Sequence, residues 1–254
     1  MSIAKYLHIL VAEDNEVNQL VLRRMLELAG HKVDTVLNGL NAVEALAKQQ
    51  YDLVIMDCLM PLMDGFEATR TIRASTDPAV NCATPILAIT ALASPQDRWR
   101  CLAAGMTGYI SKPVVANELY AWMSEHLGTA PRSVERRQPR KRIPESVDAN
   151  KHLKSRTASQ SGLIQEMAPV MLRDFRQWRQ ELKTHLDARN SGALGLLAHK
   201  IRGTADVFGY RELSTIAATL EKAARIGDEG DVAKLVHALG EALLRLIDDI
   251  ERSP

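Results

Sequence analysis

Five polar residues in the first half of the chain each follow a short apolar run, and their types together suit phosphoryl chemistry. They are Glu13, Asp14, Asp57, Thr90 and Lys112. Carboxylates placed close together repel one another, and a divalent cation that prefers oxygen ligands, Mg²⁺, compensates for that repulsion. A lysine ammonium and a threonine hydroxyl can hold the oxygens of a phosphoryl group, whose transfer needs mainly positioning and neutralisation of charge. The set predicts that Asp57 is a nucleophile that forms an acyl phosphate.

Five short apolar runs, four of which end at or just before these residues, have the pattern of strands in a parallel sheet. They cover residues 7–12, 32–36, 52–57, 85–90 and 107–112, and helix-like stretches start near Val17, Gly39, Gly65, Pro95 and Val115. Five strand–helix repeats predict an α/β doubly wound, parallel five-stranded sheet with helices on both faces.

In such a sheet, reactive residues collect at the carboxyl ends of the strands. The five polar residues are therefore expected to project into one crevice. A single aspartate after a strand is more often a cap for the next helix. That alternative weakens here because four strand ends carry suitable residues at once.

A second candidate for chemistry is His199, within the segment AHKIRGTADVFG at residues 198–209. Gly195 and Gly203 flank it at helical spacing, although glycine inside a helix is unfavourable by roughly 1 kcal/mol relative to alanine. On a helical wheel the imidazole falls away from the apolar stripe. The pattern predicts that the histidine faces solvent and that the two glycines, which lack side chains, leave room for a partner to approach it. The positive charge of Arg202 would favour an incoming phosphoryl group. A plain surface histidine is the alternative, and metal ligation lacks partners at matching spacing.

The chain divides into two predicted domains and a tether. Residues 1–128 carry the strand–helix repeats, whereas residues 129–160 hold prolines, few large apolar residues and an excess of Arg and Lys. That composition is typical of a basic flexible linker. Residues 161–254 carry four apolar stripes at i, i+3, i+4 spacing, broken at RNSG, FGY and GDEGD. They predict an all-α four-helix bundle.

Bulk composition narrows the function classes. A chain of 254 residues with 46% hydrophobic and 25% charged residues suits a soluble protein of two domains. A net charge of +1 disfavours binding to nucleic acid or an acidic membrane. Cys58, Cys82 and Cys101 form no metal-like pair or disulfide framework and predict a cytoplasmic location. The sequence shows neither a signal peptide nor an apolar stretch of about 18 residues, so no membrane span is expected.

The first half resembles the receiver domain of two-component response regulators. The segments ILVAEDN, LVIMDCLMPLMDG, AITAL and GYISKP occur in the order and at the spacing of that family, over residues 5–128. The resemblance implies phosphorylation at Asp57. It also implies that Asp14, Asp57 and the carbonyl of Leu59 hold Mg²⁺, with Glu13 contributing through water.

The same resemblance implies a switch in the receiver. Thr90 and Lys112 would respond to the phosphoryl group, and Tyr109 would be the rotating switch aromatic. The apolar Leu59, two places after Asp57, leaves the dephosphorylation rate open. It also argues against a haloacid-dehalogenase-type phosphatase, which needs a second acid at that position.

The segment AHKIRGTADVFGYRELSTIAATLE resembles the signature of histidine phosphotransfer (HPt) domains. That signature is His-x-x-Lys/Arg-Gly, then a small residue, a later Gly and a Leu–Glu, and the resemblance covers roughly residues 161–252. It implies that His199 is the phosphorylated histidine, Arg202 the basic residue and Gly203 the clearance position. A receiver followed by an HPt domain is the arrangement of hybrid histidine kinase C-terminal regions.

Together the two resemblances imply a phosphorelay protein. A histidine kinase would phosphorylate Asp57, the group would pass to His199, and a downstream receiver would take it. No P-loop or kinase lid is visible, so the chain is expected to be a phosphotransfer intermediate rather than an enzyme. Two alternatives stay open: a phosphorylation-switched interaction module or phosphate sink, and a DNA-binding response regulator. The second is disfavoured because the bundle lacks a basic recognition helix.

Overall fold

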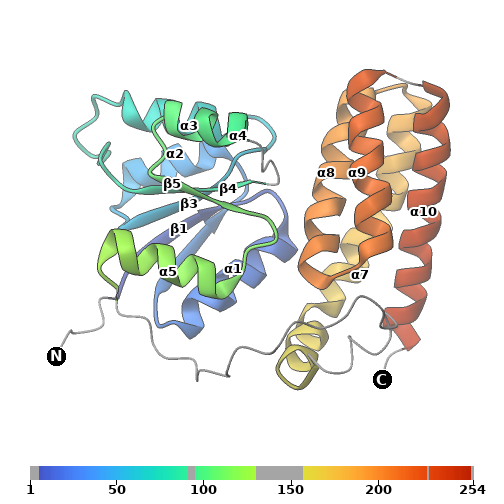
Figure 1. The fold of residues 1–254 in the computed structure, drawn as a ribbon, viewed down its shortest axis with the longest axis horizontal. Helices are drawn as coiled ribbons and strands as arrows, with labels where there is room; N and C mark the ends of the chain where they lie inside the picture. Colours follow the sequence, from blue (N-terminus) through green and yellow to red (C-terminus); the bar gives the residue numbers. More distant parts are fainter. Residues whose placement is uncertain (1–5, 91–94, 130–156, 228, 253–254) are drawn as a thin grey trace.

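The computed structural model describes residues 6–90, 95–129, 157–227 and 229–252. Figure 1 shows two parts side by side: a layered α/β part, called the sheet domain below, and a set of long helices, called the bundle. No described helix combines the length and apolar composition that crossing a membrane requires.

Five parallel strands form the centre of the sheet domain. They are β1 (His8–Ala12), β2 (Lys32–Val36), β3 (Leu53–Asp57), β4 (Ile86–Thr90) and β5 (Gly108–Ser111). Their spatial order is β2-β1-β3-β4-β5, and every neighbouring pair is parallel. Every residue of β3 and β4 is buried, as their continuous apolar sequences predict. This confirms the predicted doubly wound five-stranded sheet.

Five helices cover the two faces of the sheet. They are α1 (Glu16–Leu28), α2 (Gly39–Lys48), α3 (Gly65–Arg73), α4 (Pro95–Ala103) and α5 (Ala116–Leu127). Helices α1 and α5 share one apolar core with the sheet, and α2, α3 and α4 share the core on the opposite face (Figure 1). Short polar side chains start three of these helices: Asn15, Asn38 and Asp64 accept backbone hydrogen bonds at the first turns of α1, α2 and α3.

The bundle contains four helices within the described residues. They are α7 (Thr157–Asp187), α8 (Ser191–Phe208), α9 (Arg211–Ile226) and α10 (Glu229–Arg252). They confirm the predicted all-α bundle, and the turns fall at the predicted breaks. Helix α8 begins at an Asn190 cap and ends at Gly209, whose φ of 75° is the left-handed conformation that glycine adopts without strain. Helix α7 begins inside the segment predicted as a linker; residues 130–156 of that segment lie outside the described residues.

Helix α1 joins the two parts. Val17 and Val21 on α1 are buried in the same apolar cluster as the bundle residues, with exposed fractions of 0% and 6%. Helix α1 contacts both α7 and α8 (Figure 1). One helix therefore packs on the sheet through one face and on the bundle through another, which brings α8 to the carboxyl edge of the sheet.

Candidate functional site

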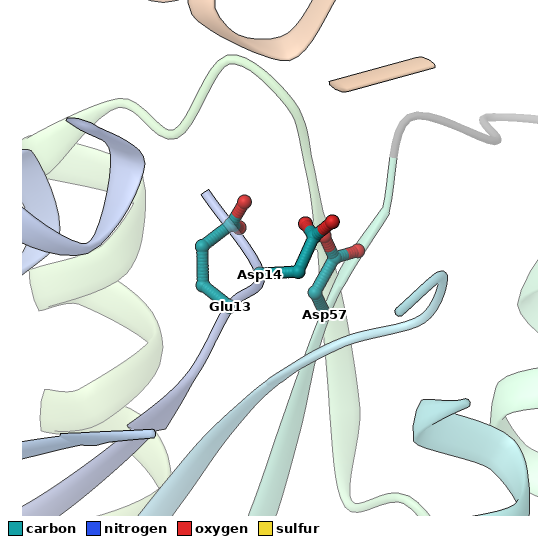
Figure 2. Close-up of side chains that lie close together, drawn as sticks. All are labelled: Glu13, Asp14 and Asp57. Carbon is teal, nitrogen blue, oxygen red and sulfur yellow. The ribbon is translucent and has the colours of Figure 1, made fainter. Parts of the chain in front are cut away.

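Three carboxylates gather at the carboxyl edge of the sheet. Glu13 and Asp14 follow β1, and Asp57 ends β3; one carboxylate oxygen from each lies within 4.8 Å of the others. Figure 2 shows the Asp14 and Asp57 side chains pointing toward one another, with Glu13 beside them. Glu13 and Asp57 are each 1% exposed. The structure thus brings together the acidic residues that the strand ends predict.

Lys112 lies among these carboxylates. Its Nζ donates to Asp57 Oδ2 at 2.6 Å and to Glu13 Oε2 at 2.8 Å, and its side chain is 8% exposed. Burial would lower the pKa of Lys112, but the Asp57 and Glu13 carboxylates outweigh burial and raise it. The ammonium is therefore charged, and it offsets only part of the acidic charge of the cluster.

The remaining acidic charge is costly without a further cation. Burial raises the pKa of Glu13 to about 7; Lys112 opposes that shift, and the neighbouring carboxylates Asp57 and Asp14 add to it. Burial also raises the pKa of Asp14. A buried group of oxygen ligands with surplus negative charge is a donor set that suits Mg²⁺.

The other receiver-type positions lie around this cluster. Thr90 ends β4 and is buried. The backbone N–H of Leu59 donates to Asp57 Oδ1 at 3.2 Å, so the loop after β3 folds back on the carboxylate. Tyr109 in β5 is half-buried, with the Arg98 guanidinium 5.0 Å from its ring centroid.

The prediction that His199 faces solvent is wrong. The histidine is 7% exposed, and its Nδ1 lies 3.3 Å from Oε1 of Glu221 on α9. Its neighbour Lys200 on α8 contacts the backbone of Asp14 in the sheet domain. Burial raises the pKa of the Asp14 carboxyl, and His199 is close enough to oppose that rise weakly. The helical wheel compares positions on one helix, so it could not include α9 or a docked domain.

Glu221 is the residue that sequence reasoning missed. Its carboxylate contacts His199 and also forms ion pairs with two arginines. The distance is 2.8 Å from Oε2 to Arg202 Nη1 and 3.3 Å from Oε1 to Arg225 Nη2. Burial would raise the pKa of Glu221, but His199, Arg202 and Arg225 outweigh burial and lower it. The available signal was a charged residue inside the apolar stripe of α9, between Ala217 and Ala224.

Gly195 and Gly203 of α8 face different elements. A Cβ at Gly203 would lie 3.2 Å from Asn18 Nδ2 on α1, so the absence of a side chain lets α1 approach α8. A Cβ at Gly195 would lie 3.6 Å from the Ala224 Cβ on α9, which is an ordinary contact inside the bundle. The prediction that Gly195 clears space for a partner is therefore wrong.

Polar contacts join α8 to the start of α1. Lys200 Nζ donates to the backbone oxygen of Asp14 at 2.9 Å and lies 3.9 Å from its carboxylate. Asn15 Nδ2 donates to Thr204 Oγ1 at 2.7 Å. The residues one and five places after His199 thus contact the segment that carries the acidic cluster. The helix of the histidine is docked at the edge of the sheet where the carboxylates lie.

Comparison with known proteins separates the same two parts. Residues 9–124 match the response regulator receiver domain family, and residues 166–252 match the Hpt domain family. Over 98% of its length the chain is 29% identical to the Sensor protein EvgS of Escherichia coli (strain K12), and it covers 20% of that protein. It is 39% identical to Probable histidine kinase 1 of Oryza sativa subsp. indica over 47% of the chain and 15% of that protein.

A solved structure resembles the first part. It is the receiver domain of sensor histidine kinase PA1611 from Pseudomonas aeruginosa PAO1, described with a magnesium ion coordinated in its active site cleft. It is 41% identical, the match covers 49% of this chain and 100% of that one, and the TM-score is 0.45. The chain spans a fifth or less of the two curated relatives named above. By these matches, residues 9–124 are a response regulator receiver domain and residues 166–252 are an Hpt domain.

Proposed function

We propose that this chain is a phosphorelay intermediate in which Asp57 accepts a phosphoryl group from a histidine kinase and exchanges it with His199. His199 then exchanges the group with the aspartate of a downstream receiver. The observation that carries the proposal is the docking of α8, through Lys200 and its neighbours, at the edge of the sheet that holds Asp57. Receiver and Hpt domains are phosphotransfer modules and not kinase cores. The free thiols of the described cysteines support a cytoplasmic location.

The donor set of the receiver fits Mg²⁺. Asp14, Asp57 and the carbonyl of Leu59 would hold the ion, and Glu13 would contribute through water. Three clustered carboxylates with Lys112 as a partner cation leave negative charge for a divalent ion to neutralise. Bound there, Mg²⁺ supplies charge neutralisation for phosphoryl oxygens.

The residues of the receiver position the phosphoryl group. The Lys112 ammonium already contacts Asp57 at 2.6 Å, so it is placed to bind an oxygen of a phosphoryl group on that carboxylate. The Thr90 hydroxyl at the end of β4 is the proposed partner for a second oxygen. These contacts neutralise the charge that spreads over the phosphoryl oxygens during in-line transfer. Tyr109, one strand away, is the proposed switch aromatic.

The residues of the Hpt domain prepare the imidazole. A carboxylate only accepts hydrogen bonds, so the Nδ1–H of His199 donates a hydrogen bond to Glu221. In the neutral ring, this tautomer leaves a lone pair on Nε2. Nε2 attacks phosphorus, the N–P bond forms, and the bond from Asp57 Oδ to phosphorus breaks. The carboxylate leaves as the anion, and the ring becomes positively charged. Glu221 offsets that charge, and Arg202, paired with Glu221, supplies positive charge beside the phosphoryl group.

A phosphate sink is the second candidate function. His199 is buried while the Hpt domain docks on its own receiver, so a downstream receiver has to displace that docking. In a sink, phosphoryl groups move between Asp57 and His199 without leaving the chain, and the receiver regulates its kinase by draining it.

The test is a transfer assay with a radiolabelled histidine kinase domain as donor. The wild type is compared with Asp57→Ala and His199→Gln. We expect acid-labile label on His199 in the wild type, base-labile label alone in His199→Gln, and no label in Asp57→Ala. Label that reaches His199 in Asp57→Ala would show that another protein loads the histidine. Adding a second receiver separates a relay, which passes label on, from a sink, which retains it.

A further inference from the structure

One buried contact between the two domains links a side-chain amide to a hydroxyl. Asn15 Nδ2 donates to Thr204 Oγ1 at 2.7 Å, and both residues are 0% exposed. Asn15 directly follows the metal-ligand candidate Asp14, and Thr204 lies five residues after His199. The contact therefore lies beside the two groups that the proposed function joins.

The amide of Asn15 is fully engaged. Its Oδ1 caps α1 by accepting from the backbone N–H of Val17 at 2.9 Å and of Asn18 at 3.2 Å. Its NH₂ group faces α8, where Thr204 Oγ1 is the near acceptor and the backbone oxygen of Lys200 lies at 3.4 Å. The oxygen of the Asn15 amide thus stabilises the start of α1 within the receiver, and its nitrogen binds α8 of the Hpt domain.

Burial makes this contact selective. A buried polar group that loses its partner costs more free energy than a hydrogen bond normally contributes. A receiver with an aliphatic side chain at the position of Asn15 would bury the Thr204 hydroxyl without its donor. A carboxylate there would add charge beside Glu13 and Asp14, which already repel each other.

We propose that Thr204 is a specificity-determining residue of the Hpt domain, which selects for docking those receivers that present an amide donor at the position of Asn15. The proposal rests on the proposed function, because the selected receivers are those that exchange phosphoryl groups with His199. Lys200 binds a backbone oxygen, which every receiver has, so this contact does not distinguish one receiver from another. The side-chain contact of Thr204 can distinguish them.

The test uses full chains in trans. Chains with His199→Gln carry phosphorylated Asp57 and act as donors, and chains with Asp57→Asn accept on His199. The acceptor carries Thr204, Thr204→Val or Thr204→Ser, and the donor carries Asn15 or Asn15→Ser. Serine keeps the α1 cap but is too short to reach α8. Thr219→Val, at an exposed site on α9, is the matched control.

We expect Thr204→Val to slow transfer from the Asn15 donor about tenfold, and Thr204→Ser to restore it. With the Asn15→Ser donor, Thr204→Val should have little further effect, because the partner is already gone. Independent, multiplying effects of the two substitutions would overturn the proposal, as would a Thr204→Val acceptor that matches the Thr219→Val control.

Docking is measured separately, by amide hydrogen exchange of α1 around Val17 in the full chain. Thr204→Val should speed that exchange, because Val17 is buried in one apolar cluster with the bundle residues, including those of α8. Wild-type chains that protect α1 but transfer nothing between Asp57 and His199 would refute the proposed function. An unchanged exchange rate in Thr204→Val would refute the role of Thr204.

Discussion

The imidazole of His199 and the carboxylate of Glu221 lie 3.3 Å apart, on neighbouring helices of the Hpt domain. The same carboxylate also pairs with Arg202 and Arg225. A carboxylate at this place favours the tautomer of His199 that carries its proton on Nδ1, and it also holds Arg202 by an ion pair. In the proposed transfer, Glu221 would be a positioning residue, since it acts through His199.

Replacing Glu221 with Gln should slow phosphoryl transfer from Asp57 to His199 by about tenfold. An amide can donate to Nδ1 and so stabilise the wrong tautomer, and it cannot offset the charge of the phosphorylated ring. Single-turnover transfer measures the rate, and ¹⁵N NMR of the imidazole measures the tautomer. Glu241→Gln, at an exposed site on α10, is the control. A rate and a tautomer equal to those of the control would exclude this role.

The pH dependence of stability should also depend on Glu221. The pKa of Glu221 is lowered from its ordinary value of 4.5, so its charged form stabilises the folded state. That contribution is fully present above about pH 4.5 and is lost as the pH falls through the lowered folded-state pKa. When the pH is lowered from 5 to about 3, the free energy of unfolding of Glu221→Gln should therefore fall less than that of the wild type. Urea unfolding at each pH measures it. Parallel profiles for the two proteins would contradict the assignment.

Removing the Lys112 ammonium should destabilise the receiver in a way that Mg²⁺ partly reverses. Lys112→Met leaves Glu13 and Asp57 buried without the cation that contacts both. Loss of one partner of a buried ion pair costs about 3–5 kcal/mol, and proton uptake by the carboxylates reduces that cost. Thermal unfolding with and without Mg²⁺ measures the effect, and phosphorylation of Asp57 should fall as well. If Mg²⁺ raises the melting temperature of neither the wild type nor Lys112→Met, the acidic cluster does not bind the ion as proposed.

Gly195 and Gly203 of α8 should respond oppositely to substitution by alanine. At Gly195 a Cβ meets Ala224 at an ordinary 3.6 Å, so Gly195→Ala should raise the melting temperature through its better helix propensity. At Gly203 a Cβ would lie 3.2 Å from Asn18 Nδ2, which is held by Glu13 at 2.9 Å and cannot easily move. Gly203→Ala should therefore weaken docking and slow transfer to His199. Hydrogen exchange of α1 and the transfer rate measure it, and equal behaviour of both variants would refute the assigned orientations.

The sequence alone determined where the helices and strands lie and which polar residues stand at the ends of the strands. Alternating apolar runs and amphipathic stretches predicted the sheet, because a parallel strand is buried on both faces. The acidic crevice followed, because parallel strands end at the same edge. The four helices of the bundle followed from their apolar periodicity. All of these depend on residues close together in the chain.

Only the tertiary structure decided what surrounds the histidine. His199 meets Glu221 across 22 positions, and Asn15 meets Thr204 across 189. A helical wheel assigns one apolar face and takes the opposite face as solvent, so it failed at His199 and Gly195. The face it left open is covered by a neighbouring helix and by the receiver. Contacts of that kind depend on how separate elements pack, which local periodicity does not encode.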